Sequence, residues 1–310
     1  MKVRNIPSHG YSRYLFGVQY VGKYFCGWQS NVDAPSPTVQ DTLKEAFRQF
    51  LRGKERHLNH LSALNFEKFR GSSRTDAKVN AIRNTFQIDL PMRQLTGSQR
   101  ESNYTSPELC QAINFYLSSR HVAITDARVV SPSFDVRRDV ESRTYFYRIF
   151  YRPAHIQPHY GYSNLFQKDF AWTIDEPLDV DAMIRASRCL LGWHDFSSFR
   201  NAGCDSPTPI RNIMRLEIRE HEGGPSSDFL MDDYRLIVIT IVANAFLLRM
   251  VRNIVAVLVE VGRGRKEVME MELILRAKSR TVINKVSPAP PEGLYLQHVT
   301  HSFNPPVDFF

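Results

Sequence analysis

The segment Leu236–Val242 is apolar on both faces of an extended chain. A strand with one polar face can expose that face to solvent. A strand without a polar face must have neighbouring strands and packed side chains around it. The segment therefore predicts a central, buried strand. Arg143–Tyr151 alternates between two sets of side chains and carries aromatic residues on both, which predicts a second strand with two contacting faces.

Helical patterns are interspersed with these strands. Thr38 precedes an apolar stripe at helical spacing, with Asp41 at the capping-box position, so we expect a helix over 39–52. Strands and helices do not alternate regularly, which favours an α+β fold over a doubly wound sheet. Further strands are expected at 14–20, 85–90, 122–130, 210–219 and 294–299, and further helices at 107–117, from Asp179 or Asp181 to near Gly192, at 246–261 and at 267–277.

The length of 310 residues suggests two domains. The Ser131-Pro132-Ser133 stretch is the best boundary, which gives an N-terminal half over 12–130 and a C-terminal half over 131–301.

Charge and composition restrict the function. A formal net charge of +8 favours a polyanionic partner. The four cysteines lie far apart, so we expect neither a zinc site nor a disulfide framework. No apolar stretch reaches the roughly 18 residues that a membrane helix needs. The N-terminus lacks a secretory pattern, so we expect an intracellular protein and leave mitochondrial, cytoplasmic and nuclear residence open.

Three features combine into a candidate site. Asp76 lies in a polar loop, where a carboxylate is more often a turn or cap residue than a nucleophile. Tyr145 lies on the aromatic strand and could stack on a base. Arg252 interrupts an apolar helical pattern, together with Arg249 and Asn253 at helical spacing. Burying a guanidinium costs free energy unless a nearby anion compensates its charge. A loop carboxylate, a helix arginine and a stacking tyrosine suit chemistry on an RNA base.

These residues belong to an ordered set of motifs that extends along nearly the whole chain. The loop motif is Ser73-Arg74-Thr75-Asp76-Ala77 with Val79 and Ala81. The other motifs are Gln19-Tyr20 with Gly22, Phe25 and Gly27-Trp28; Pro37–Gln40; Phe134–Arg137; Arg143–Tyr147; Gly192–Phe196; Ala243–Leu247; Met250–Val255; and Ala289–Leu294. The set resembles the TruA-type tRNA pseudouridine synthases, most closely the animal synthase-like branch, and the loop motif matches the catalytic loop of that family.

The resemblance implies a fold of two ferredoxin-like halves that share a mixed, mainly antiparallel sheet with a basic central cleft. It also implies isomerisation of uridine to pseudouridine in tRNA by a homodimer, without a metal or an organic cofactor. Asp76 would be the nucleophile, Arg252 would pair with it, and Tyr145 would stack on the uracil. The expected substrate contacts are Arg74, Thr75, Leu294, Asn253 and Arg249.

Two positions depart from the family pattern. The family loop commonly has Gly and His where this chain has Lys78 and Asn80. A Gly there suggests a backbone conformation that Lys enters only at some strain. The altered loop keeps a second hypothesis open, a catalytically inactive RNA-binding protein of the same fold that acts in RNA assembly or folding. The sequence does not decide which uridine or tRNA is modified, or whether Asp76 attacks the base or the sugar.

Overall fold

The computed structural model describes residues 10–52, 69–94, 101–156, 167–221, 234–283 and 285–302. The chain forms two compact units, Met1–Glu141 with Leu296–Phe310, and Ser142–Tyr295. The halves expected from the sequence, 12–130 and 131–301, place the boundary earlier and assign the last strand to the second half. That the two expected halves are functional domains stays a prediction.

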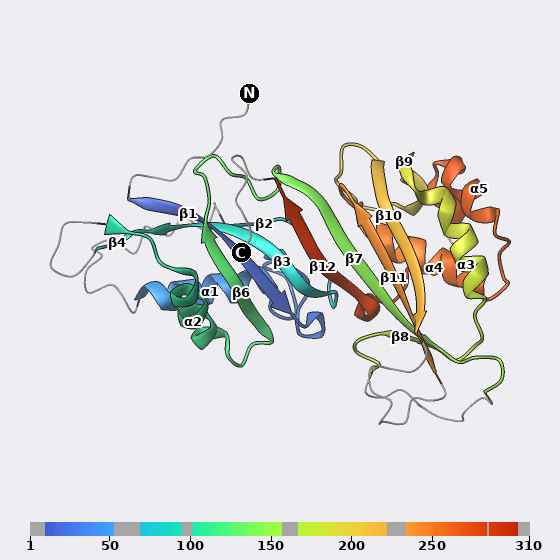
Figure 1. The fold of residues 1–310 in the computed structure, drawn as a ribbon, viewed down its shortest axis with the longest axis horizontal. Helices are drawn as coiled ribbons and strands as arrows, with labels where there is room; N and C mark the ends of the chain where they lie inside the picture. Colours follow the sequence, from blue (N-terminus) through green and yellow to red (C-terminus); the bar gives the residue numbers. More distant parts are fainter. Residues whose placement is uncertain are drawn as a thin grey trace. The chain divides into compact units, whose positions relative to one another are not determined.

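In its described residues, the first unit is an antiparallel sheet with two α-helices (Figure 1). Its elements are β1 (Tyr11–Tyr20), the short helix η1 (Gly22–Tyr24), α1 (Val39–Arg52), β2 (Arg70–Gly71), β3 (Asn80–Pro91), the hairpin of β4 (Arg93–Gln94) and β5 (Glu101–Ser102), α2 (Ser106–Leu117) and β6 (Val122–Val129). Strand β1 lies between β3 and β6, and β2 pairs with β3.

Aromatic packing fixes α1 on this sheet. Phe16 of β1 stacks on its cross-strand partner Phe86 at a centroid distance of 5.1 Å, and Phe47 of α1 meets Phe16 edge-on at 5.2 Å. The start of α1 is capped as predicted, because the Asp41 N–H donates to the Thr38 hydroxyl over 3.2 Å. The predicted helix over 39–52 is confirmed.

The second unit has a central strand between two long neighbours. Its elements are β7 (Val140–Tyr151), β8 (Trp172–Ile174), α3 (Val180–Ser187), η5 (Arg188–Leu190), β9 (Gly192–Asp195), η6 (Ser197–Phe199), β10 (Ile210–His221), β11 (Arg235–Ala243), α4 (Met250–Gly262), α5 (Glu270–Ala277), η7 (Arg280–Ile283) and η8 (Pro291–Gly293). Strand β12 (Leu294–His301) begins in this unit.

The prediction that Leu236–Val242 is a central strand is confirmed, because β11 pairs antiparallel with β7 on one side and β10 on the other. Burial is uneven across its two faces. Ile237, Ile239 and Ile241 are fully buried, whereas Val238 and Val242 are partly exposed. The segment is therefore central, but only one of its faces is fully covered.

Three predicted helix boundaries were wrong, and one of them is the start of the helix expected over 267–277, which begins at Glu270. The helix expected over 246–261 begins at Met250, because Arg249 has a left-handed backbone with φ 58° and the chain before it is not helical. The helix expected to end near Gly192 ends at Ser187, and β9 starts at Gly192. Its N-cap is Asp179, whose carboxylate accepts the Ala182 N–H over 2.8 Å.

The α+β class and a large mixed sheet are confirmed. The sheet is mixed because β8 pairs parallel with β7, whereas the pairings within β1–β3 and β9–β11 are antiparallel. Within the part of the chain that the structure describes, no helix is long and apolar enough to cross a membrane.

Candidate active site

The polar loop that carries Asp76 joins β2 to β3 in the first unit. Thr75 is buried, Asp76 is half-buried and Arg74 is exposed. The Thr75 carbonyl accepts the Trp28 N–H over 3.1 Å, and the Thr75 hydroxyl is 2.8 Å from the Tyr20 hydroxyl. Thr75 is thus fixed by its backbone and its side chain, while its two neighbours keep access to solvent.

Two glycines allow the chain to approach this loop closely. Gly27 has φ +99°, and a Cβ there would lie 2.9 Å from the Thr75 carbonyl oxygen. A Cβ on Gly22 would lie 2.3 Å from the Val79 carbonyl oxygen. Any side chain at either position would displace the loop backbone, which explains why the segment before Trp28 needs glycine at both positions.

The two departures from the family pattern have different structural consequences. Lys78 has φ 64°, the left-handed conformation that the sequence predicted as strained for Lys. Asn80 is buried, and its side-chain oxygen accepts the Gly22 N–H over 2.8 Å. Asn80 therefore supports the loop, whereas Lys78 adopts its turn at a cost.

A network of buried polar side chains beneath the loop was missed by the sequence analysis. Asn84 is fully buried and donates to the Tyr20 hydroxyl over 3.3 Å and to the Ser73 carbonyl over 3.1 Å. The Ser72 hydroxyl donates to the Asn84 side-chain oxygen over 3.0 Å. The signal was a run of polar residues, Arg83-Asn84-Thr85, in a strand that is buried over most of its length.

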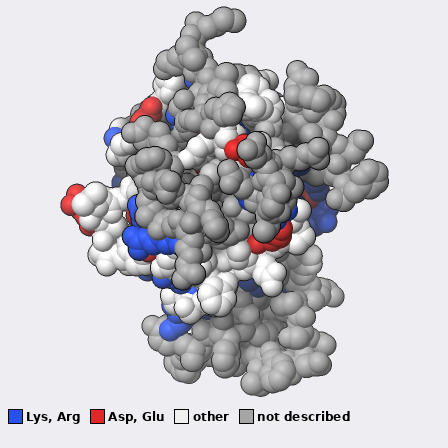
Figure 2. All heavy atoms as spheres, turned by 90° about the vertical axis from the view of Figure 1, so that its left-hand side faces the viewer, with Lys and Arg blue, Asp and Glu red and all other residues white. Residues whose placement is uncertain are grey.

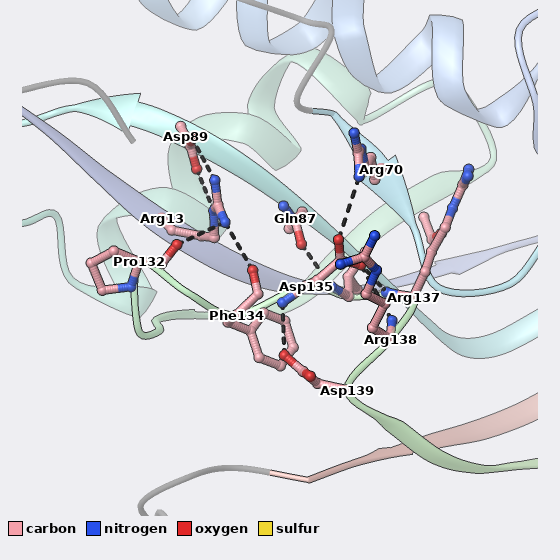
Figure 3. Close-up of polar contacts among 12 residues, drawn as sticks. Arg13, Arg70, Gln87, Asp89, Pro132, Phe134, Asp135, Arg137, Arg138 and Asp139 are labelled. Carbon is pink, nitrogen blue, oxygen red and sulfur yellow. Dashed lines mark hydrogen bonds and ion pairs between the residues drawn. The ribbon is translucent and has the colours of Figure 1, made fainter. Parts of the chain in front are cut away.

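The segment 131–139 is anchored by a buried arginine of β1 (Figure 3). Arg13 binds both carboxylate oxygens of Asp89 at 2.8 and 3.0 Å and donates to the carbonyls of Pro132 and Phe134 at 2.9 and 2.8 Å. Arg137 donates to the Gly71 carbonyl over 3.2 Å. The Phe134–Arg137 motif therefore lies against β2, which leads directly into the Asp76 loop.

In the second unit Tyr145 lies on β7, opposite Ile241 of β11. Its side chain is buried and meets the Phe246 ring edge-on at a centroid distance of 5.1 Å. Tyr147 follows on the same face and donates to the Pro290 carbonyl over 2.7 Å. Burial raises the pKa of the Tyr147 phenol well above its ordinary value, and the nearby Arg252 charge opposes that rise.

Arg252 is half-buried and tied to the segment before β12. Its Nε donates to the Ala289 carbonyl over 2.6 Å, and the Ala289 N–H donates to the Arg252 carbonyl over 3.2 Å. Leu294 is buried at the start of β12. The backbone of Gly293 is so close to the Tyr147 ring that a Cβ would lie 2.7 Å from it. The second unit therefore brings the Tyr145 strand, Arg252 and the residues before Leu294 together.

The prediction that Arg249 shares a helix with Arg252 was wrong. Arg249 is exposed and precedes the first turn of α4, because its left-handed backbone cannot continue the helix. Asn253 is on α4 but buried, and its amide donates to the Phe199 carbonyl over 2.8 Å. This contact gives Asn253 an internal supporting role. Substrate contacts of both residues stay predictions, as does the pairing of Asp76 with Arg252.

Four cationic side chains of the second unit have protein partners. Arg263 pairs with Glu260 at 2.9 Å, Arg265 with Glu176 at 3.0 Å and Lys266 with Glu270 at 2.8 Å, and Arg200 donates to the carbonyls of Cys204 and Ser206. On the face shown in Figure 2, cationic and anionic side chains both occur among the described residues. The basic cleft stays a prediction.

Within the described ranges, no three His, Cys, Asp or Glu side chains lie close enough together to bind a metal ion.

Comparison with known proteins identifies the class of protein to which this chain belongs. Residues 186–302 match the family model described as tRNA pseudouridine synthase. The chain is 33% identical over 289 residues to tRNA pseudouridine synthase A of Paraburkholderia phymatum, covering 93% of this chain and 90% of that protein. It is 33% identical to the protein of the same name from Bordetella avium, covering 94% and 92%, and 31% identical to that from Xanthobacter autotrophicus, covering 93% and 99%. The chain belongs to the TruA-type family of tRNA pseudouridine synthases. Its place in the animal branch stays a prediction.

Proposed function

We propose that this protein is an enzyme that isomerises uridine to pseudouridine in tRNA. The observation that carries the proposal is the similarity to proteins named tRNA pseudouridine synthase A along 93% of the chain, which includes the Asp76 loop. The reaction breaks the bond between N1 of uracil and C1′ of ribose. It then joins C5 to C1′, and the proton leaves C5 while N1 gains one.

Asp76 is proposed as the nucleophile of this reaction. An anion beside the sugar and base can form the covalent intermediate that holds one fragment while the base turns. Its loop supports this role, because Thr75 and the backbone around it are held by buried contacts while Asp76 itself keeps access to solvent. Whether Asp76 attacks C1′ or the base is left open.

The remaining site residues are proposed in supporting roles. The guanidinium of Arg252 is oriented by its bond to the Ala289 carbonyl and has a planar fork suited to a carboxylate. Tyr145 would stack on the uracil, with Leu294 packing on the other side of the pocket. The exposed Arg74 would occupy the space that the uridine leaves or bind a backbone phosphate, because the target base must leave its stack before reaction.

The proposed partners are tRNA, bound in a basic cleft, and a second copy of the chain in a homodimer. Thr75, Asn253 and Arg249 remain proposed substrate contacts. An intracellular residence is also proposed, and imaging of a tagged protein would distinguish mitochondria from cytoplasm and nucleus. Light scattering at several concentrations would test the dimer.

The test is incubation of the purified protein with unmodified tRNA transcripts, followed by chemical mapping of pseudouridine. We expect modification at defined uridines, which would also identify the position. Asp76→Asn is the matched control because it preserves volume. Wild-type protein that binds tRNA tightly but modifies no uridine in any tRNA would overturn the proposal in favour of an inactive RNA-binding protein.

A further inference from the structure

His301 is the last residue of β12 and lies far from the Asp76 loop in the sequence, yet it is buried with both ring nitrogens engaged. Its Nε2 is 2.8 Å from the Thr85 hydroxyl, and its Nδ1 is 3.2 Å from the Asp139 carbonyl. The Phe134 ring meets the imidazole edge-on at a centroid distance of 5.5 Å. The ring is therefore fixed between the segment before β7 and the polar network beneath the loop.

The direction of the hydrogen bonds in this network follows from one backbone group. The Thr85 N–H donates to the Asn84 side-chain oxygen over 2.8 Å, and a backbone N–H can only donate, so this amide oxygen is identified without ambiguity. The Ser72 hydroxyl, 3.0 Å from the same oxygen, must therefore donate to it. The amide nitrogen of Asn84 is left to donate towards Tyr20.

The donors on either side are then fixed in turn. Because the single Ser72 proton points to Asn84, the Thr85 hydroxyl must donate its own proton to Ser72, over 2.8 Å. Thr85 then has no proton for His301, so the imidazole must carry a proton on Nε2 and donate it. Because the Asp139 carbonyl can only accept, Nδ1 donates to it as well only when the ring carries a second proton. At the other end, the Tyr20 hydroxyl accepts from Asn84 and lies 2.8 Å from the Thr75 hydroxyl, a contact in which either hydroxyl can donate.

We propose that His301 is a positioning residue for Asp76. It supplies the first donor of a chain of hydrogen bonds that runs in one direction through Thr85, Ser72 and Asn84 to Tyr20, whose hydroxyl contacts that of Thr75. Ser72 and Thr75 are both part of the loop, so the chain fixes the loop at its base and beside the carboxylate. The inference rests on the proposed function, because its catalytic readout is pseudouridine formation.

Three substitutions at His301 separate positioning from simple core packing. Gln places an amide N–H close to the position of Nε2, Asn places one close to Nδ1, and Phe fills the space without a donor. We expect His301→Phe to lower kcat about tenfold, a moderate loss for a misplaced catalytic group, with KM for tRNA unchanged. His301→Gln should restore most of kcat, and His301→Asn should not. A packing role would lower the melting temperature in all three and leave kcat of the folded enzyme unchanged.

Thr85→Val tests the second link, since it removes only the hydroxyl. We expect it to lower kcat as much as His301→Phe, and the double variant to be no slower, because both break one chain. Thr42→Val is the matched control: Thr42 is also buried, and its hydroxyl donates to the Thr38 carbonyl within α1. It should leave kcat unchanged.

Hydrogen exchange of the loop peptide 72–80 provides a readout that needs no turnover. We expect faster exchange in His301→Phe and Thr85→Val, and near-normal exchange in His301→Gln. Unchanged exchange and unchanged kcat in folded His301→Phe would overturn the inference while leaving the proposed function intact. A wild-type protein without synthase activity would overturn the proposed function, and loop exchange alone would then decide whether His301 positions the loop.

Discussion

The Asp76 loop and the Arg252 region are held by different forces. The loop rests on side-chain hydrogen bonds among buried polar groups, from Tyr20 to Thr75 and through Asn84. Arg252 lies on α4, whose other residues from Met250 to Val259 are all buried, so that region is held mainly by packing. The loop should therefore respond to the loss of single hydrogen bonds, and the Arg252 region to changes of volume and shape.

The largest effects on turnover are expected from substitutions of Asp76 and Arg252, which are proposed to form a charged pair. Asp76→Asn removes the anion but preserves volume, so pseudouridine formation should fall below detection while tRNA still binds. Arg252→Lys should be slow rather than inactive, because an ammonium keeps the charge and loses the planar fork. Single-turnover assays with filter-binding controls measure both.

The double variant Asp76→Asn, Arg252→Lys should be no slower than Asp76→Asn alone, as expected for residues that act as one unit. Substantial turnover by a cleanly purified Asp76→Asn protein would show that this loop does not carry the nucleophile.

The contrast also explains what the sequence could predict. Apolar residues at helical spacing predicted α1, and an uninterrupted apolar run predicted the central position of β11, because both signals are local in the sequence. The predicted start of α4 was wrong, because the residues before Met250 have a composition typical of helices. The left-handed backbone at Arg249 cannot be recognised from that composition. The spacing of apolar residues indicates which face of a helix or strand is buried, but it does not indicate where the backbone changes direction.

For the site, the resemblance identified the loop and its neighbours, whereas the support beneath the loop could not be derived. The hydrogen bonds between His301 and Thr85 and between Asn84 and Tyr20 join residues far apart in the chain. Only the strained Lys78 was anticipated, since the family's glycine at that position indicates a conformation rather than a contact.

The next largest effect is expected at Tyr145, which is held by packing against Phe246. Tyr145→Leu should weaken tRNA binding and slow turnover, since stacking on an aromatic is worth about 1–3 kcal/mol per base. Tyr145→Phe keeps the stacking surface, so near-normal affinity with reduced turnover would assign the hydroxyl to proton removal. Equal turnover of Tyr145→Phe and wild type would exclude the hydroxyl from the chemistry.

A smaller effect should separate exposed cations by their partners. Arg74 is exposed on the Asp76 loop, where it is proposed to contact RNA, and Arg265 of the other unit pairs with Glu176 at 3.0 Å. Arg74→Ala should reduce the slope of log affinity against log salt by about 0.7–0.9, the value for one phosphate contact. Arg265→Ala should leave the slope unchanged, and a reduced slope there would mean that the Glu176 pair opens to bind RNA.

The smallest effect concerns the strained loop residue. Lys78→Gly relieves a left-handed conformation that costs an L-residue about 1–2 kcal/mol, but Gly also gains conformational entropy in the unfolded chain. The free energy of unfolding should therefore rise by only about 0.5–1 kcal/mol. Lys278→Gly is the matched control, because Lys278 is exposed with φ 47° at the end of α5 in the other unit. Urea unfolding should show a similar gain for both variants, whereas turnover should change only in Lys78→Gly, whose turn adjoins Asp76. Equal turnover in both variants would show that the strain at Lys78 affects stability alone.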